Sequence, residues 1–182
     1  MIPVTISTQR LVLEQPTLAD ANHIAEYCSD PLFEHLMTTP WPYERKHAVH
    51  FVESYVPIGW EDDKEYTWAI RRDGEFAGMI GYRTELGMIG FWLGAPHRGL
   101  GIMTEAATAV VDWVFEQGSP SVRWECVEGN AASASVARKL GFTYTGSGPG
   151  AVTARDGSAS PSWLATLLAT DSRAEKPGWP QP

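Results

Sequence analysis

The sequence predicts an α/β (α+β) fold, in which helices flank a mixed, mostly antiparallel and twisted central sheet of about six or seven strands. Three observations support this prediction. Strand patterns in the first half are joined by a short hairpin turn. A strand, a long amphipathic helix and another strand follow one another in the middle of the chain. Helical patterns occur both before and after these strands, so helices are expected on both sides of the sheet.

The first part of the chain predicts one strand and two helices. Residues 9–15 (QRLVLEQ) alternate as in a half-buried strand. Thr17 is a suitable N-cap for a helix that runs to the Asp30-Pro31 break. A proline-rich loop and a second helix follow within residues 38–56. Both helices precede the main strands, so they should pack against a sheet formed later in the sequence.

The remainder of the chain supplies most of the strands. Asp73-Gly74 predicts a hairpin turn. The helix after residue 101 has apolar residues mainly on one side, as expected of a helix packed on a sheet. Gly141 is a natural C-cap for a shorter helix that begins near Ala131. Strands are predicted at residues 65–72, 76–84, 88–94, 121–128, 142–150 and 162–170.

Length and composition indicate one domain. The chain has 182 residues, 43% of them hydrophobic, which is enough for a sizeable core. We expect residues 1–172 to form this domain and residues 173–182, which are rich in proline, to be a flexible tail. Nothing resembles a signal peptide or a membrane-spanning segment, so we expect a cytoplasmic protein that does not bind membranes, either a monomer or a homodimer.

Charge and cysteine content exclude some functions. The net charge of −8 disfavours a nucleic-acid partner but is compatible with a cationic substrate such as an amine. The two cysteines, Cys28 and Cys126, are far apart and have no metal-binding spacing, so reduced thiols and no metal are expected.

The segment HRGLGIMTEA, residues 97–106, contains the strongest candidate binding motif. A helix N-terminus leaves about four backbone N–H groups unpaired and attracts anions. Gly99 and Gly101 would let a ligand approach the backbone, and Arg98 could add a charge-assisted hydrogen bond to a phosphate. A simple strand-to-helix turn is the alternative. The spacing fits neither a nucleotide P-loop nor a dinucleotide fingerprint.

Arg98-Gly99-Leu100-Gly101-Ile102-Met103 resembles the pyrophosphate-binding R/Q-x-x-G-x-G/A motif of the GNAT acyltransferase superfamily. It departs from the motif at Met103, as does the ribosomal-protein N-terminal acetyltransferase (RimJ/RimL-like) branch. A second block, GNAASASVARKLGF, resembles the N-x-x-S-x-x-V-x-x-K-L-G-F signature of that branch. Both blocks occur in the right order, and the resemblance covers roughly residues 8 to 170.

The resemblance implies a fold and a cofactor site. The fold would be the GNAT acyl-CoA N-acyltransferase fold, with acetyl-CoA as co-substrate. Backbone groups at the end of one strand would bind the pantetheine arm, and one N–H would polarise the thioester carbonyl. The residues expected to contact CoA are Trp92, Leu93, Gly94, His97, Arg98, Gly99, Leu100, Gly101, Ile102, Met103, Thr104, Asn130 and Ser133.

Ser133 and Asn130 each have an ordinary structural explanation as well. Ser133 falls on the apolar side of its helix, where its hydroxyl needs a partner, either a CoA thiol or a carbonyl one turn earlier. The resemblance implies that Ser133 protonates the departing thiolate; other branches use a tyrosine, which makes Tyr144 a second candidate. Asn130 can be the N-cap of the helix, contact CoA, or do both.

The acceptor side is less clearly defined by the sequence. Glu125 is the candidate base, with Glu128 and Glu85 as further carboxylates; all three could equally be solvated surface charges. The histidines His35, His47, His50 and His97 are further options. Trp41 and Tyr43 could contact the acceptor or anchor their loop in the core.

These observations predict an acetyl-CoA-dependent N-acetyltransferase. Its acceptor would be a primary amine, either a protein N-terminus or a small molecule, that attacks the thioester directly. A non-catalytic acyl-CoA-binding module, an acyltransferase that uses a longer acyl donor and a nucleotide-phosphate binder are the alternatives.

Overall fold

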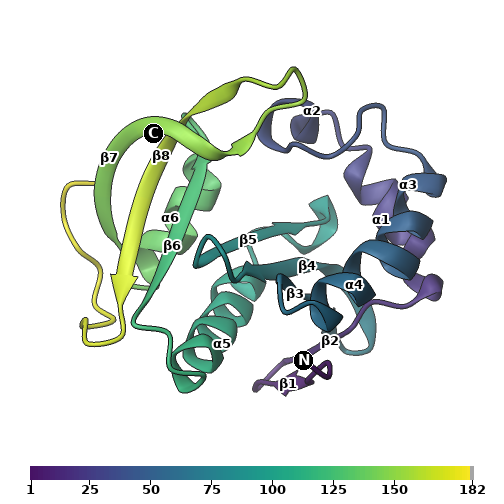
Figure 1. The fold of residues 1–182 in the computed structure, drawn as a ribbon, viewed down its shortest axis with the longest axis horizontal. Coiled ribbons are helices and arrows are strands. Elements are labelled where there is room, and N and C mark those ends of the chain that lie inside the picture. Colours follow the sequence, from purple (N-terminus) through teal and green to yellow (C-terminus); the bar gives the residue numbers. More distant parts are fainter. Residues whose placement is uncertain (181–182) are drawn as a thin grey trace.

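The computed structural model describes residues 1–180 and contains one eight-stranded sheet in the order β1-β2-β3-β4-β5-β6-β8-β7 (Figure 1). Neighbouring strands are antiparallel except for the parallel pair β5 and β6. The fold class predicted from the sequence is therefore confirmed. The strands are β1 (Ile6–Ser7), β2 (Leu11–Glu14), β3 (Glu65–Arg72), β4 (Glu75–Arg83), β5 (Met88–Leu93), β6 (Ser121–Val127), β7 (Thr143–Thr153) and β8 (Ala159–Leu168).

Helices cover the sheet from two sides. Ile24 and Ala48, from the early helices, are buried in a cluster with Phe76 and Met79 of β4. Val110 of the long helix is buried in a separate cluster with Ile80 and Ile89 of the sheet. The helices are α1 (Ala21–Cys28), α2 (Leu32–Leu36), α3 (Arg45–His50), α4 (Val56–Glu61), α5 (Ile102–Glu116) and α6 (Ala131–Lys139).

The observed elements differ from the predicted ones in detail. The sheet has one or two strands more than expected, partly because β1 is only two residues long and too short for an alternating pattern. The second early helix is longer than expected: α3 and α4 are joined by a π-helical turn, Phe51–Tyr55. The short helix α2 fills the predicted break after Asp30-Pro31, because Pro31 can precede a helix although it ends the previous one.

The C-terminal segment lies against the sheet as far as it is described. Trp179 is 9% exposed and packs edge-on against Trp124 of β6 and beside Tyr144 of β7. Residues 181–182 of the expected tail lie outside the described residues. Among residues 1–180, no helix has the length and apolarity needed to cross a membrane.

Candidate acyl-CoA site

The glycine loop forms an open N-terminus for α5. Gly99 and Gly101 both have φ of 75°, in the left-handed region that glycine adopts without strain. Gly101 is the N-cap, and no side chain caps the helix. Ile102 and Met103 are buried and hold the first turn against the core. The N–H groups of this turn are therefore fixed in place and left to a ligand, as an anion site requires.

β5 and β6 separate beside this loop. The two strands pair through Met88 with Arg123 and through Ile89 with Trp124, and then diverge (Figure 1). Residues 90–93 keep their partners on β4. One edge of β5 is therefore open along the second half of the strand.

Alternation along β5 determines which main-chain groups face this opening. Gly94 donates its N–H to Ala77 at 2.9 Å, so Trp92 also directs its main-chain groups toward β4. The main-chain groups of Phe91 and Leu93 therefore point toward β6 and the opening. Leu93 was expected in this role, whereas Phe91 was missed. Counting alternate residues back from Leu93 would have found it.

Arg98 is held by protein groups. Its Nε donates to the Leu93 carbonyl at 3.0 Å, and its Nη1 lies 2.8 Å from a carboxylate oxygen of Asp30. The guanidinium also lies over the Phe33 ring at 5.0 Å. A hydrogen bond from the Leu32 N–H lowers the pKa of Asp30, and Arg98 adds to this effect, so the ion pair persists at neutral pH. Arg98 thus joins the glycine loop to the α1–α2 segment, and the loop backbone remains for an anion.

His97 and Gly94 are packed against α1. The Tyr27 hydroxyl lies 3.0 Å from Nε2 of His97. A Cβ added at Gly94 would lie 2.4 Å from the Tyr27 ring, so only glycine fits there. Both residues therefore fix the turn after β5 in place.

Ser133 and Asn130 lie at the start of α6. The Asn130 side chain accepts a hydrogen bond from the Ser133 N–H at 3.1 Å and is the N-cap of the helix. The Ser133 hydroxyl accepts from Nε1 of Trp124 at 3.2 Å, a partner that neither sequence-based interpretation included. Trp124 lies on β6, so this bond holds the hydroxyl beside the strand that diverges from β5.

Cys126 is a neutral thiol beside Ser133. Burial, and next the charge of Glu125, raises the pKa of Cys126 to about 12, while a hydrogen bond with Ser133 acts in the opposite direction. The thiol donates to the Asn130 carbonyl at 3.7 Å. A thiol with this pKa does not act as a nucleophile at neutral pH.

Glu125 and Tyr144 make contacts of their own. Each oxygen of the Glu125 carboxylate accepts a backbone N–H from β7, from Ala151 at 2.8 Å and from Val152 at 2.9 Å. Because side chains alternate along β6, Glu125 lies on the face opposite Trp124 and Ser133. The Tyr144 hydroxyl lies 3.1 Å from the Ser147 hydroxyl. The structure therefore places Glu125 and Ser133 on opposite faces of the sheet.

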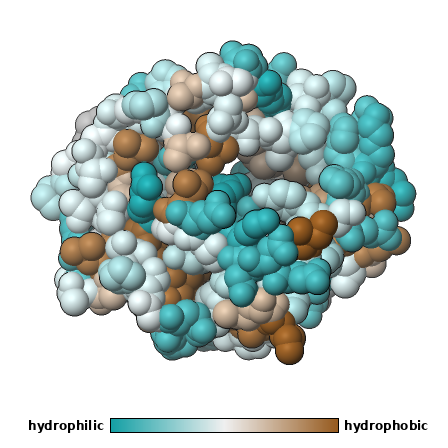
Figure 2. All heavy atoms as spheres, viewed as in Figure 1, coloured by the Kyte–Doolittle hydropathy of each residue, from teal (hydrophilic) through white to brown (hydrophobic). Residues whose placement is uncertain are grey.

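The segment of residues 33–41 and the turn between β7 and β8 contact each other. Arg155 of the turn donates to the carbonyls of Phe33 at 3.1 Å and Thr39 at 2.5 Å, and also to that of Glu34. Its guanidinium lies 5.9 Å from the centre of the Trp41 ring. Figure 2, which has the same view as Figure 1, shows that the molecular surface is hollowed near its centre.

Trp41 and Tyr43 have different environments. Tyr43 is 9% exposed in the cluster under α1 and α3, and burial raises its pKa. Tyr43 therefore anchors its loop in the core, which is the second of the two roles that the sequence allowed. Trp41 is half-buried and contacts Arg155. Within residues 1–180, no group of three or more His, Cys, Asp or Glu side chains is arranged to hold a metal ion.

A diverging strand pair beside an open helix N-terminus defines an acyltransferase type of fold, and sequence comparison identifies the family. The model of the acetyltransferase (GNAT) domain matches residues 10–143, more than half of the chain. The protein belongs to the GNAT acetyltransferases. The recognition made from the two sequence blocks is thereby confirmed. A sequence search of curated proteins gives no match.

Solved structures with the same fold include RimJ and RimL. RimL, the ribosomal L7/L12 alpha-N-protein acetyltransferase in complex with coenzyme A, has a TM-score of 0.78 at 18% identity, covering 91% of this chain and 98% of its own. Mycobacterium smegmatis RimJ in complex with CoA-disulfide has a TM-score of 0.78 at 20% identity, covering 93% and 90%. The microcin C7 self-immunity acetyltransferase MccE, in complex with acetyl-CoA and AMP, has a TM-score of 0.76 at 22% identity, covering 88% and 93%.

Proposed function

We propose that this acetyltransferase uses acetyl-CoA to acetylate a primary amine by direct attack on the thioester. The observation that carries the proposal is the open edge of β5 next to the uncapped N-terminus of α5. The open edge of β5 offers a row of main-chain groups that can hydrogen-bond to an extended amide chain. The N-terminus of α5 offers N–H groups to an anion. A pantetheine arm joined to a pyrophosphate matches both.

The cofactor contacts follow from this geometry. The N–H groups of residues 101–104 bind the pyrophosphate, and the main-chain groups of Phe91 together with the Leu93 N–H bind the pantetheine arm, since the Leu93 carbonyl already accepts from Arg98. One of these N–H groups polarises the thioester carbonyl as negative charge develops on its oxygen. Gly99 and Leu100 shape the loop.

Ser133 and Glu125 divide the proton transfers between the two faces of the sheet. The Ser133 hydroxyl gives its proton to the sulfur as the carbon–sulfur bond breaks, and it regains a proton from solvent water. Glu125, on the other face, takes the proton that the amine loses as the carbon–nitrogen bond forms, directly or through one water. Tyr144, held by Ser147 and Trp179, is the second candidate acid.

An α-amine is the acceptor that this site suits best. Its unperturbed pKa is about 8, against about 10.4 for a lysine side chain, so a single carboxylate suffices as base. The fold shared with RimL, which acts on an alpha-amine of a ribosomal protein, supports a protein N-terminus. MccE, a microcin self-immunity enzyme, makes a small-molecule amine the second candidate. The buried, reduced Cys28 accords with a cytoplasmic setting.

Thermal unfolding with acetyl-CoA tests the donor. A ligand at about 100 times its Kd adds about 2.7 kcal/mol of stability, so acetyl-CoA should raise Tm clearly while ATP and NAD leave it unchanged. Longer acyl-CoA thioesters are compared in the same way. An equal shift with ATP would instead support a nucleotide-phosphate binder, and no shift with millimolar acetyl-CoA would contradict the proposal.

Ser133→Ala separates an enzyme from a binding module. With an acceptor found among N-terminal peptides and small amines, we expect kcat to fall by about a hundredfold and acetyl-CoA affinity to change little. Ser135→Ala, on the same helix, is the matched control. If no acceptor is acetylated although acetyl-CoA binds, the protein is a non-catalytic acyl-CoA-binding module.

A further inference from the structure

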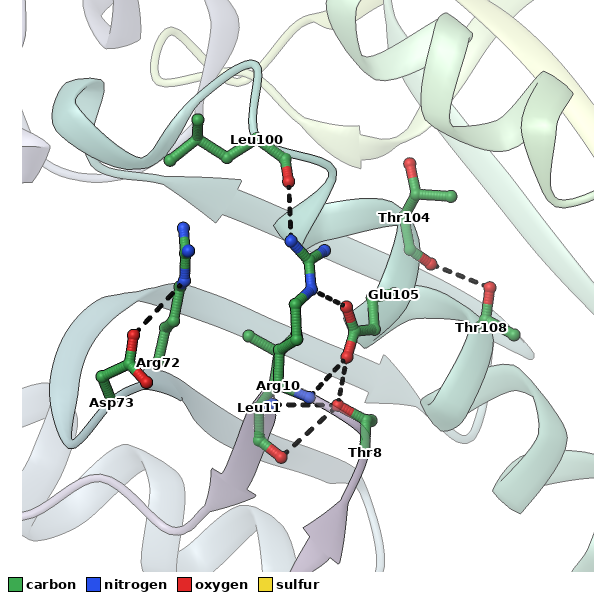
Figure 3. A network of polar contacts seen from close by, with 9 residues as sticks. All are labelled: Thr8, Arg10, Leu11, Arg72, Asp73, Leu100, Thr104, Glu105 and Thr108. Atoms are coloured by element: carbon green, nitrogen blue, oxygen red, sulfur yellow. Dashed lines mark hydrogen bonds and ion pairs between the residues drawn. The ribbon is translucent and has the colours of Figure 1, made fainter.

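Arg10 lies between the start of β2 and the glycine loop, outside the motifs so far assigned to the site. Its Nη1 donates to the Leu100 carbonyl at 3.3 Å, and its Nε donates to the Glu105 carboxylate at 2.7 Å (Figure 3). A Cβ added at Gly101 would lie 3.5 Å from Nη2 of Arg10. One guanidinium therefore contacts the loop before α5 and the first turn of α5 together.

Glu105 fixes the orientation of this guanidinium. Its Oε1 accepts from the Thr8 hydroxyl at 2.6 Å and from the Arg10 N–H at 3.0 Å, while Oε2 accepts from Nε of Arg10. Burial would raise the pKa of Glu105, but the hydrogen bonds from Thr8 and Arg10 outweigh it, so the pKa is lowered. Glu105 is therefore charged at neutral pH and holds Arg10 in one position.

The bond to Leu100 determines the direction of the next N–H. In a trans peptide the C=O and the N–H point in opposite directions. With the Leu100 carbonyl turned toward Arg10, the Gly101 N–H points away from the β1–β2 loop. Without Arg10, the orientation of this peptide would depend on ψ of Leu100 and φ of Gly101, and a glycine has access to many values of φ.

We propose that Arg10 is a positioning residue for CoA, which holds the Leu100–Gly101 peptide so that its N–H is preset for the pyrophosphate. The inference rests on the proposed CoA site at the glycine loop. It gives the opening strand of the domain a role in donor binding. The advantage is in preorganisation, because a loop already ordered loses less entropy when the ligand binds.

Arg72 offers a matched control for charge. It lies in the same region (Figure 3), but its Nε faces Asp73 at 3.5 Å in an exposed pair. Arg72→Met removes one positive charge as Arg10→Met does, without touching the loop. A general attraction between positive charge and phosphates would make the two variants equivalent.

Calorimetric titration with CoA and with 3′-dephospho-CoA tests the proposal. We expect Arg10→Met to raise the Kd of both ligands by about tenfold, which corresponds to about 1.4 kcal/mol, and Arg72→Met to change it by less than about twofold. Arg10→Lys keeps the charge but reaches only one of the two acceptors, the Leu100 carbonyl or the Glu105 carboxylate. Its Kd should therefore lie between the values for Arg10→Met and Arg72→Met. In turnover, KM for acetyl-CoA should rise while kcat stays unchanged, because the lost binding is uniform.

Three results would overturn the proposal. An unchanged Kd in Arg10→Met, even with a lowered Tm, would mean that Arg10 only stabilises the fold. An equal loss in Arg72→Met would mean a general charge effect. A loss confined to CoA would mean direct contact with the 3′-phosphate. If Arg10→Met does not fold, Arg10→Lys carries the same comparisons. Failure of the wild-type protein to bind CoA would contradict the proposed function itself.

Discussion

The two halves of the proposed site, one for the donor and one for the acceptor, are built in different ways. On the donor side, the loop before α5 depends on local backbone conformation: two glycines at φ of 75° and an uncapped first turn. On the acceptor side, the contacts join segments far apart in sequence, such as Arg155 with the carbonyls of Phe33 and Thr39. The proposed donor loop is thus shaped mainly by local backbone conformation, with Arg10 as its long-range contact, whereas the proposed acceptor surface is assembled from segments far apart in sequence.

Ion pairs occur in both halves. On the donor side, the partly exposed Arg10–Glu105 pair orients the Leu100–Gly101 peptide, and Arg98 of the glycine loop pairs with Asp30. Asp20 with Arg71 is a more deeply buried pair beside α1. High salt should therefore weaken the Arg10–Glu105 pair more than the Asp20–Arg71 pair.

Gly101→Asp should give the largest effect on the donor side. A side chain at φ of 75° is strained, and the added carboxylate would repel the pyrophosphate at the helix N-terminus. We expect acetyl-CoA binding to weaken by at least about a hundredfold. Gly157→Asp is the control, since Gly157 has φ of 84°, open space around its Cα and a place in the distant β7–β8 turn. Unchanged affinity in Gly101→Asp, measured by calorimetry, would contradict the assignment of the loop.

The difference between local conformation and contacts across the fold also explains what the sequence could predict. Glycine spacing and helix caps are local signals, so the loop at Gly99 and Gly101 and the N-cap at Asn130 could be identified before the structure was known. The partner of Ser133 could not, because the bond to Trp124 depends on how α6 packs back against β6, which no local residue pattern determines. The same holds for Arg10, whose contacts to Leu100 and Glu105 span 90 or more positions.

Asp20→Asn should give the next largest effect, on stability. Asp20 is 3% exposed and accepts two hydrogen bonds from Arg71, each 2.8 Å long. Replacing it leaves Arg71 half-buried without its full charge partner, which should cost about 2 kcal/mol at neutral pH. Urea unfolding measures this. Asp62→Asn breaks the exposed pair with Lys64 and should leave the free energy of unfolding almost unchanged, because water screens this pair.

The pH dependence of stability gives a second measurement on the same residue. Burial would raise the pKa of Asp20, but the bonds from Arg71 and Thr17 together lower it below its ordinary value of 3.8. A carboxyl whose pKa is lower in the folded state stabilises the protein above its unfolded pKa, and this contribution is lost as the pH falls through the folded pKa. Asp20→Asn should therefore lose stability less steeply than the wild type below about pH 4. If the stability of Asp20→Asn and that of the wild type changed with pH in parallel, the Asp20–Arg71 pair would not stabilise the start of α1.

Arg155→Ala should have the smallest effect and the most selective one. The side chain joins the β7–β8 turn to the carbonyls at the end of α2 and contacts Trp41, while the glycine loop lies elsewhere. Without it the turn is no longer tied to the N-terminal segment, so KM for the acceptor should rise by about tenfold while acetyl-CoA affinity changes by less than about twofold. Arg45→Ala removes an exposed arginine that bonds Asn22 and is the matched control. A rise in KM for both substrates would show that the turn also shapes the donor site, and the separation of the two halves would then be wrong. A change in acceptor KM alone would identify the turn and the loop at Trp41 as the place where acceptor preference is set.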